Sequence, residues 1–141
     1  MAARSQKPLE LILARNLLTS ISTPAFLVDE HAALVFFNEA AAALLGRSFE
    51  DAGRMTPEEW TATFGPFDAG GEPVALDDLP TTQAVRRGRP AHAEFRIRAT
   101  NGAEHAIEAS AVPIVASEAG SSGAMIFFWP TGTNGKAARG G

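Results

Sequence analysis

The first apolar pattern along the chain has the spacing of an α-helix. Leucine and isoleucine recur every three or four positions from Pro8 to about Ser20, which predicts a helix that proline opens in its first turn. The stripe consists of Leu9, Ile12, Leu13, Leu17 and Ile21, flanked by Leu11 and Leu18. So wide an apolar surface on a short helix must pack against something, because contiguous exposed apolar patches are rare on monomers.

Two short apolar runs and an alanine-rich segment follow. Residues 25–28 and 34–37 are predicted to pair as the strands of a hairpin. Asn38 is a favourable N-cap for a helix over residues 39–45, and we expect its loss to cost about 1 kcal/mol, as is usual for such a cap. Gly46 stands where a C-cap glycine belongs.

The middle of the chain, residues 49–79, is rich in helix breakers and is expected to be irregular. Within it, residues 56–59 (Thr-Pro-Glu-Glu) have the composition of a helix start. The helix that they open would carry Trp60 and Phe64 towards the core.

A further helix is predicted over residues 80–87, which begin with proline. Asp77 or Asp78 is available to cap its N-terminus, and Gly88 ends it. This acidic pair is therefore interpreted as helix-capping charge and not as a pair of metal ligands.

The last third of the chain has the pattern of strands. Phe95 and Ile97 point to one side of their strand, and charged residues alternate with them. Residues 101–102 (Asn-Gly) predict a two-residue hairpin turn, and residues 117–123 predict a second turn. The expected strands are residues 93–99, 105–115 and 124–129.

This order of elements predicts an α+β domain with an antiparallel sheet, whose helices cover one face. The N-terminal helix is additional to that shell, so it can cover the other face. Residues 1–7 and 131–141 are polar or rich in glycine, and we expect both ends to be disordered.

The hairpin and helix together resemble the PAS domain family. The resemblance covers about residues 18–129, and we assign residues 23–130 to the PAS domain and residues 8–22 to its flanking helix. It implies a PAS fold: a five-stranded antiparallel sheet in the order 2-1-5-4-3, short helices around a pocket on one face, and an N-terminal flanking helix that often mediates dimers. The segments that carry it are 24–29 (PAFLVD), 34–41 (LVFFNEAA), 44–46 (LLG), 79–80 (LP), 85–90 (VRRGRP) and 126–129 (IFFW).

The resemblance implies a pocket but not its ligand. The candidate pocket residues are Phe26, Val28, Leu44, Leu45, Trp60, Phe64, Val85, Phe95, Ile97, Ile126 and Phe128. The same side chains also suit an ordinary filled core, and the sequence leaves both interpretations open.

The amino-acid composition excludes several kinds of metal and cofactor site. The chain has no cysteine, which excludes disulfides, thiolate metal sites and the cysteine-dependent flavin photochemistry of LOV domains. The three histidines, His31, His92 and His105, lie near predicted turns, and none lies on the helix over residues 80–87 that carries the ligand in haem-binding PAS domains. We therefore expect no haem, no other cofactor and no metal, and we expect surface histidines.

The net charge and the length of the chain limit the kinds of partner that we expect. The 141 residues correspond to one domain, and the net charge of −4 argues against nucleic acid as a direct partner. No apolar run approaches the length of a membrane helix, so a cytoplasmic protein is expected. The PAS resemblance is to the bacterial type and implies a bacterial protein. Five arginines are interpreted as a solvated surface, with a patch for an anionic partner as the alternative: Arg86, Arg87, Arg89, Arg96 and Arg98.

Three functional hypotheses remain. The first is a non-enzymatic sensory or regulatory PAS module that acts by homodimerisation and protein contact, with a small apolar ligand as an option. The second is a purely structural dimerisation domain with a filled core, and the third is a small cone-shaped enzyme of the nuclear-transport-factor type. The expected dimer interface is Leu9, Ile12, Leu13, Asn16, Leu17 and Ile21, with the alternative that the helix only caps its own sheet.

Overall fold

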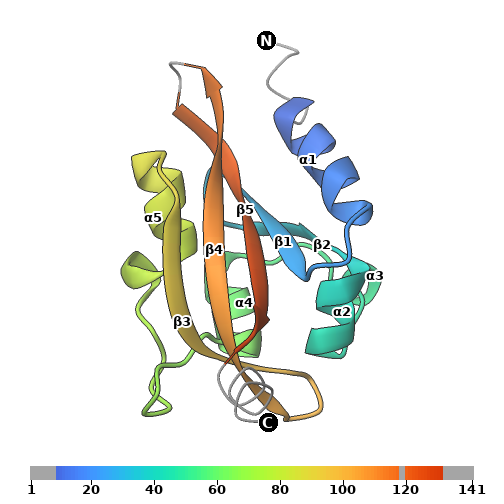
Figure 1. Ribbon diagram of the computed structural model, residues 1–141, viewed down its shortest axis with the longest axis vertical. Helices are drawn as coiled ribbons and strands as arrows, with labels where there is room; N and C mark the ends of the chain where they lie inside the picture. Colours follow the sequence, from blue (N-terminus) through green and yellow to red (C-terminus); the bar gives the residue numbers. More distant parts are fainter. Residues whose placement is uncertain (1–8, 118–119, 132–141) are drawn as a thin grey trace, which may run out of the picture.

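The computed structural model describes residues 9–117 and 120–131, so the predictions for residues 1–7 and 132–141 lie outside the described residues. Its centre is a five-stranded antiparallel sheet in the order β2-β1-β5-β4-β3 (Figure 1). Both the strand order and the α+β class agree with the prediction. The strands are β1 (Ala25–Asp29), β2 (Leu34–Phe37), β3 (Ala91–Arg98), β4 (Glu104–Ser117) and β5 (Gly120–Pro130).

Short helices cover one face of this sheet and a single helix packs on the other. In Figure 1, α1 lies at the upper right beside β1, and α5 lies at the left beside β3. The helical elements are α1 (Leu9–Thr19), α2 (Glu39–Leu45), α3 (Phe49–Ala52), α4 (Pro57–Phe64), the short 3₁₀ helix η2 (Leu76–Asp78) and α5 (Pro80–Arg87).

Alternation along β5 separates two hydrophobic cores. Ile126 and Phe128 are buried in the larger core, beneath α2, α4 and α5. Met125 and Phe127 point to the opposite face and pack in the smaller core beneath α1. Successive side chains of a strand point to opposite faces, so this central strand contributes to both cores.

Two predicted helix starts are confirmed. The side chain of Asn38 accepts a hydrogen bond from the N–H of Ala41 at the start of α2, and Gly46 ends that helix in the left-handed conformation, with φ 79°. At α4, Thr56 and Glu59 form a reciprocal capping box. Trp60 and Phe64 on this helix are buried, as expected.

The start of α5 differs from the prediction. Its N-cap is Leu79, which provides no capping hydrogen bond, and neither Asp77 nor Asp78 caps the helix. Asp77 lies in η2, and its carboxylate pairs with Arg86 at 3.0 Å. Both aspartates are part of this 3₁₀ turn, which the sequence did not indicate, and they therefore precede the N-cap position.

Several boundaries in the strands also differ. The β3–β4 loop has three residues, 100–102, between the hydrogen-bonded Ala99 and Ala103, not the two that were predicted. The predicted turn over residues 117–123 is largely strand, because β4 reaches Ser117 and β5 begins at Gly120. Thr131, assigned to a disordered tail, donates its N–H to the carbonyl of Ala106 at 2.9 Å.

Two further findings complete the fold. The helix α3 was not predicted, since its four residues are too few to show a hydrophobic period. Among the described helices, none combines the length and the apolar character needed to cross a membrane.

Candidate functional site

The helix α1 has two apolar faces. Leu11, Ala14 and Leu18 are buried against the outer face of the sheet, where they contact a cluster that includes Leu27 and Val35. The opposite face remains exposed, and the exposed fractions there are 64% for Leu9, 44% for Ile12, 57% for Leu13 and 51% for Leu17. The helix therefore caps its own sheet and still presents a second apolar surface.

The expected interface residues thus separate into two groups. Asn16 lies among the exposed residues of α1, together with the four apolar residues named above. Ile21 does not, because it follows the end of the helix at Thr19 and packs, half-buried, against the outer core of its own chain. Helical spacing placed Ile21 on the stripe, but the helix stops two residues before it.

Asn38 connects α1 to the rest of the fold. Its side-chain oxygen accepts the N–H groups of Ala25 and Ala41, at 3.1 and 3.0 Å. Its amide nitrogen donates to the carbonyls of Leu18 and Thr23, at 3.0 and 2.9 Å. With only 2% of its surface exposed, this side chain joins the end of α1, the start of β1 and the start of α2.

The inner face of the sheet encloses a small cavity. Its volume is about 50 Å³, far below the roughly 300 Å³ at which ligand pockets usually begin. Its walls come from β1, β2, α2, α4, α5 and the last three strands, and are almost entirely apolar. Aromatic rings pack together in this wall, and the centroid of the Phe26 ring lies 5.7 Å from that of Trp60 and 5.8 Å from that of Phe128.

Eight of the eleven candidate pocket residues line this cavity, and three do not. Val28 is fully buried in the same core, while Leu44 and Val85 are partly buried at its edge. The eight that line the cavity are Phe26, Leu45, Trp60, Phe64, Phe95, Ile97, Ile126 and Phe128.

The sequence interpretation omitted other residues of the cavity wall. Leu34 and Phe37 were missed because every position of β2 is apolar, so its pattern does not show which side chains point inward. Ile107 and Ala109 were missed because both faces of β4 carry small or apolar residues. Pairing of Ala109 with Phe128 on β5 would have located it, but pairing is not visible in one sequence.

Trp60 closes one wall of the cavity and is held in place by a hydrogen bond. Its indole N–H donates to the carbonyl of Ala32 in the β1–β2 turn at 3.0 Å. Ala32 itself has a positive φ of 64°, a conformation that is uncommon for residues other than glycine. This bond joins α4 to the first hairpin.

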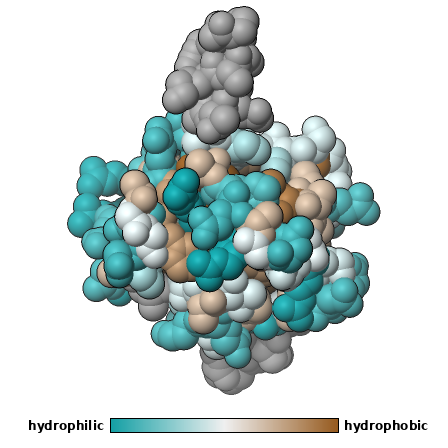
Figure 2. Space-filling model, turned by 90° about the horizontal axis from the view of Figure 1, so that it is seen from below, coloured by the Kyte–Doolittle hydropathy of each residue, from teal (hydrophilic) through white to brown (hydrophobic). Residues whose placement is uncertain are grey.

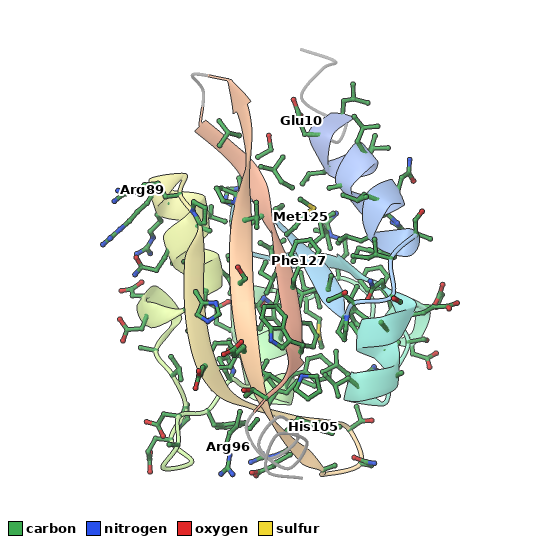
Figure 3. The ribbon with its side chains drawn as sticks, in the orientation of Figure 1. Glu10, Arg89, Arg96, His105, Met125 and Phe127 are labelled. Carbon is green, nitrogen blue, oxygen red and sulfur yellow. The ribbon has the colours of Figure 1, made fainter. Side chains whose placement is uncertain are left out.

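Titratable side chains lie outside the cavity. His31 is exposed in the β1–β2 turn, His92 is exposed on β3, and His105 is half-buried at the lower end of the sheet (Figure 3). In the described residues, no three of the His, Asp and Glu side chains are grouped so that they could hold a metal ion. The cavity wall offers no acid or base among those residues.

The cavity leads to a prediction about packing. Replacing Ala109, which lines the void, by valine is expected to change the free energy of unfolding by less than about 1 kcal/mol, because the added methyl groups occupy empty space. Replacing Ala111, two residues along the same strand and fully buried outside the void, is expected to cost about 1–3 kcal/mol through overpacking. Urea denaturation of both variants measures the difference, and equal losses would mean that the void is absent in solution.

Comparison with known proteins gives no match at the level of sequence but a clear match in structure. No protein-family model matches the chain, and no curated protein matches it either. A PAS domain from Colwellia psychrerythraea is 19% identical, with a TM-score of 0.60 over 85% of this chain and 97% of its own length. The PAS domain of BvgS from Bordetella pertussis is 14% identical, with a TM-score of 0.61 over 93% of each chain.

A light-oxygen-voltage (LOV) protein from Rhodobacter sphaeroides is also similar. It is 12% identical, and the alignment has a TM-score of 0.69 over 92% of this chain and 72% of that protein. Together with the strand order and the helices on the inner face of the sheet, these alignments show that this chain has the PAS fold.

Proposed function

We propose that this chain is a non-enzymatic sensory or regulatory module that acts by homodimerisation and protein contact through α1. The observation that carries the proposal is the exposed apolar face of that helix, formed by Leu9, Ile12, Leu13 and Leu17. Surfaces of this kind on soluble proteins usually mark interaction sites. By contrast, hydrophilic side chains predominate at the end of the molecule seen in Figure 2.

A second copy of the chain is the partner that this face suits best. The opposite face of α1 is already used by its own sheet, so the exposed residues have no remaining partner within the described part of the chain. Two such faces packed together would bury leucine and isoleucine symmetrically, as twofold dimers do. Asn16 among the leucines would then fix the register of the two helices.

The volume of the core cavity limits the size of any ligand that it could hold. At about 50 Å³ it is several times too small for haem or flavin, and we propose that the chain works without either. Apolar cavities of roughly 150 Å³ bind benzene or xenon, so an apolar molecule of a few atoms is the largest ligand that this one suits. A nearly filled core equally favours the second hypothesis, a domain that only pairs.

The enzyme hypothesis has less support. A cone-shaped enzyme of the nuclear-transport-factor type would need a histidine and a carboxylate facing an enclosed cavity. The closest such pair in the described residues, His31 and Glu30, lies 3.4 Å apart on the exposed β1–β2 turn. We therefore propose a cytoplasmic binding module and not a catalyst.

Sedimentation velocity of charge-bearing variants tests the dimer. The double variant L13E/L17E is expected to sediment as a monomer at concentrations where the unmodified chain is a dimer, with the dissociation constant raised at least about a hundredfold. Deletion of the helix would be a poorer test, because it also uncovers Leu27 and Val35 on the sheet.

The control variant places a single glutamate on another helix. Ala62 is exposed on α4, and A62E is expected to leave the dissociation constant unchanged. If the unmodified chain is monomeric at every concentration, or if L13E/L17E dimerises as tightly as A62E, the proposal is wrong.

A further inference from the structure

A second hollow lies outside the core, between the β1–β2 turn, the start of α4 and one face of α5. Its volume is about 320 Å³, which is within the usual range for small-molecule pockets. Thr82, Val85 and Arg86 line it from α5, since residues three and four apart share one face of a helix. Ala32 and Pro57 contribute apolar walls.

The wall of this cleft includes hydrogen-bond donors that have no acceptor among the described residues. Thr82 is only 9% exposed, and no hydrogen bond of its hydroxyl occurs among the described residues. Since Leu79 leaves α5 uncapped, the backbone N–H group of Thr82 is also unpaired in this part of the chain. Buried donors without partners are unfavourable, and the positive end of a helix favours a negatively charged acceptor.

Arg86 adds a positive charge one turn further along the same face, and its guanidinium lies 3.0 Å from the carboxylate of Asp77. A ligand carboxylate at the start of α5 could therefore accept from the hydroxyl and the free N–H group of Thr82 and from Arg86. Charged, planar acceptors suit an arginine particularly well.

In contrast to Arg86, most of the charged side chains on the rim of the cleft are negative. Three carboxylates line it, those of Glu30, Glu58 and Asp77, against one arginine and His31. Asp77 is paired with Arg86, and Glu30 lies 3.4 Å from His31. No ion pair involving Glu58 occurs among the described residues, so this rim favours a ligand that also carries a positive group and disfavours a simple anion.

We propose that this cleft binds a small zwitterion of the α-amino-acid class. The carboxylate of the ligand lies at the start of α5 on Thr82, its ammonium group faces Glu58 and the other rim acids, and its short side chain contacts Val85 and Pro57. This site is separate from the α1 surface and from the core cavity, so it can succeed or fail independently of the proposed dimer.

Amide chemical shifts of the full chain, titrated with L-alanine, test this proposal. Shifts are expected at Thr82 and at its neighbours in the cleft, with saturation in the millimolar range. Acetate and methylamine, which each carry one of the two charges, are expected to bind at least roughly tenfold more weakly, since each loses one set of charged contacts.

Three variants locate the binding groups. T82V removes the buried hydroxyl and keeps the shape, and it is expected to weaken L-alanine binding roughly tenfold, the value of one hydrogen bond to a charged group. T81V is the matched control, because Thr81 faces the core cavity from the next position of α5. E58Q is expected to weaken the binding of L-alanine but not the binding of acetate. R86Q, at an exposed position, tests the carboxylate subsite if T82V does not fold.

The proposal fails if L-alanine at tens of millimolar shifts no amide in the cleft. It also fails if acetate binds as tightly as L-alanine, which would indicate an anion site only, or if T82V and T81V bind L-alanine equally well.

Discussion

Replacing Asn38 by alanine is expected to lower the free energy of unfolding by on the order of 4 kcal/mol, well above the roughly 1 kcal/mol of an ordinary helix cap. The side chain is 2% exposed and makes four hydrogen bonds, to Leu18, Thr23, Ala25 and Ala41. Alanine would leave all four of those backbone groups without this partner, in buried positions for three of the bonds and a partly buried one for the bond to Thr23. Unsatisfied buried groups lose their full hydration energy. Urea denaturation measures the loss.

Ser48 provides the matched control, because it is the N-cap of α3 and bonds only the N–H of Asp51, in an exposed position. S48A is expected to cost about 1 kcal/mol or less. N38D separates the two halves of the Asn38 network, since it keeps the acceptor for Ala25 and Ala41 but loses the donors to Leu18 and Thr23. Equal losses in N38A and S48A would show that Asn38 is no more than a cap.

The second large effect is expected at Gly123 on β5. A Cβ atom added there would overlap the carbonyl oxygen of Val28 and lie 3.0 Å from the Cα of Asp29. Both are backbone atoms of the neighbouring strand β1, so neither can rotate aside. We expect G123A to destabilise the fold by on the order of 4 kcal/mol, because β1 and β5 would have to separate locally.

Gly53 is the comparison for this variant. It also has a positive φ, of 68°, but a Cβ atom there would meet no atom within 4 Å. G53A is expected to cost about 1–3 kcal/mol, the backbone strain alone, because its φ of 68° and ψ of −174° lie in a region that is essentially restricted to glycine. If thermal denaturation shows equal losses for G123A and G53A, the close approach of β1 to β5 is wrong.

The sequence predicted correctly those helices and strands whose ends are marked by neighbouring residues. The boundaries of α2, α5 and β2 agree with the expectation, because a cap, a proline or a glycine marks each of them. The role of Asn38 was predicted only in part. Its contact with Ala41 is three residues away, whereas its bonds to Leu18 and Thr23 join segments that no single-sequence pattern relates.

For the candidate surfaces, too, contacts between segments far apart in the sequence could not be predicted. The periodicity of α1 predicted an apolar face, but both faces are apolar, and the sequence did not show that Leu11 and Leu18 would face the sheet. The strand order followed from the family resemblance, not from pairing signals. The cleft at Thr82 combines residues of the first hairpin, α4, η2 and α5, and it becomes visible only when these segments are brought together.

The positions of the two tryptophans have a practical consequence. The chain contains two tryptophans and no tyrosine, so indole dominates its intrinsic fluorescence. Trp60 lies in the wall of the core cavity with 6% of its surface exposed, whereas Trp129 lies on the outer face of the sheet with 36% exposed. An aqueous quencher such as iodide should therefore suppress the emission of Trp129 first. The remaining fluorescence would report separately on the interior of the domain, without any added label.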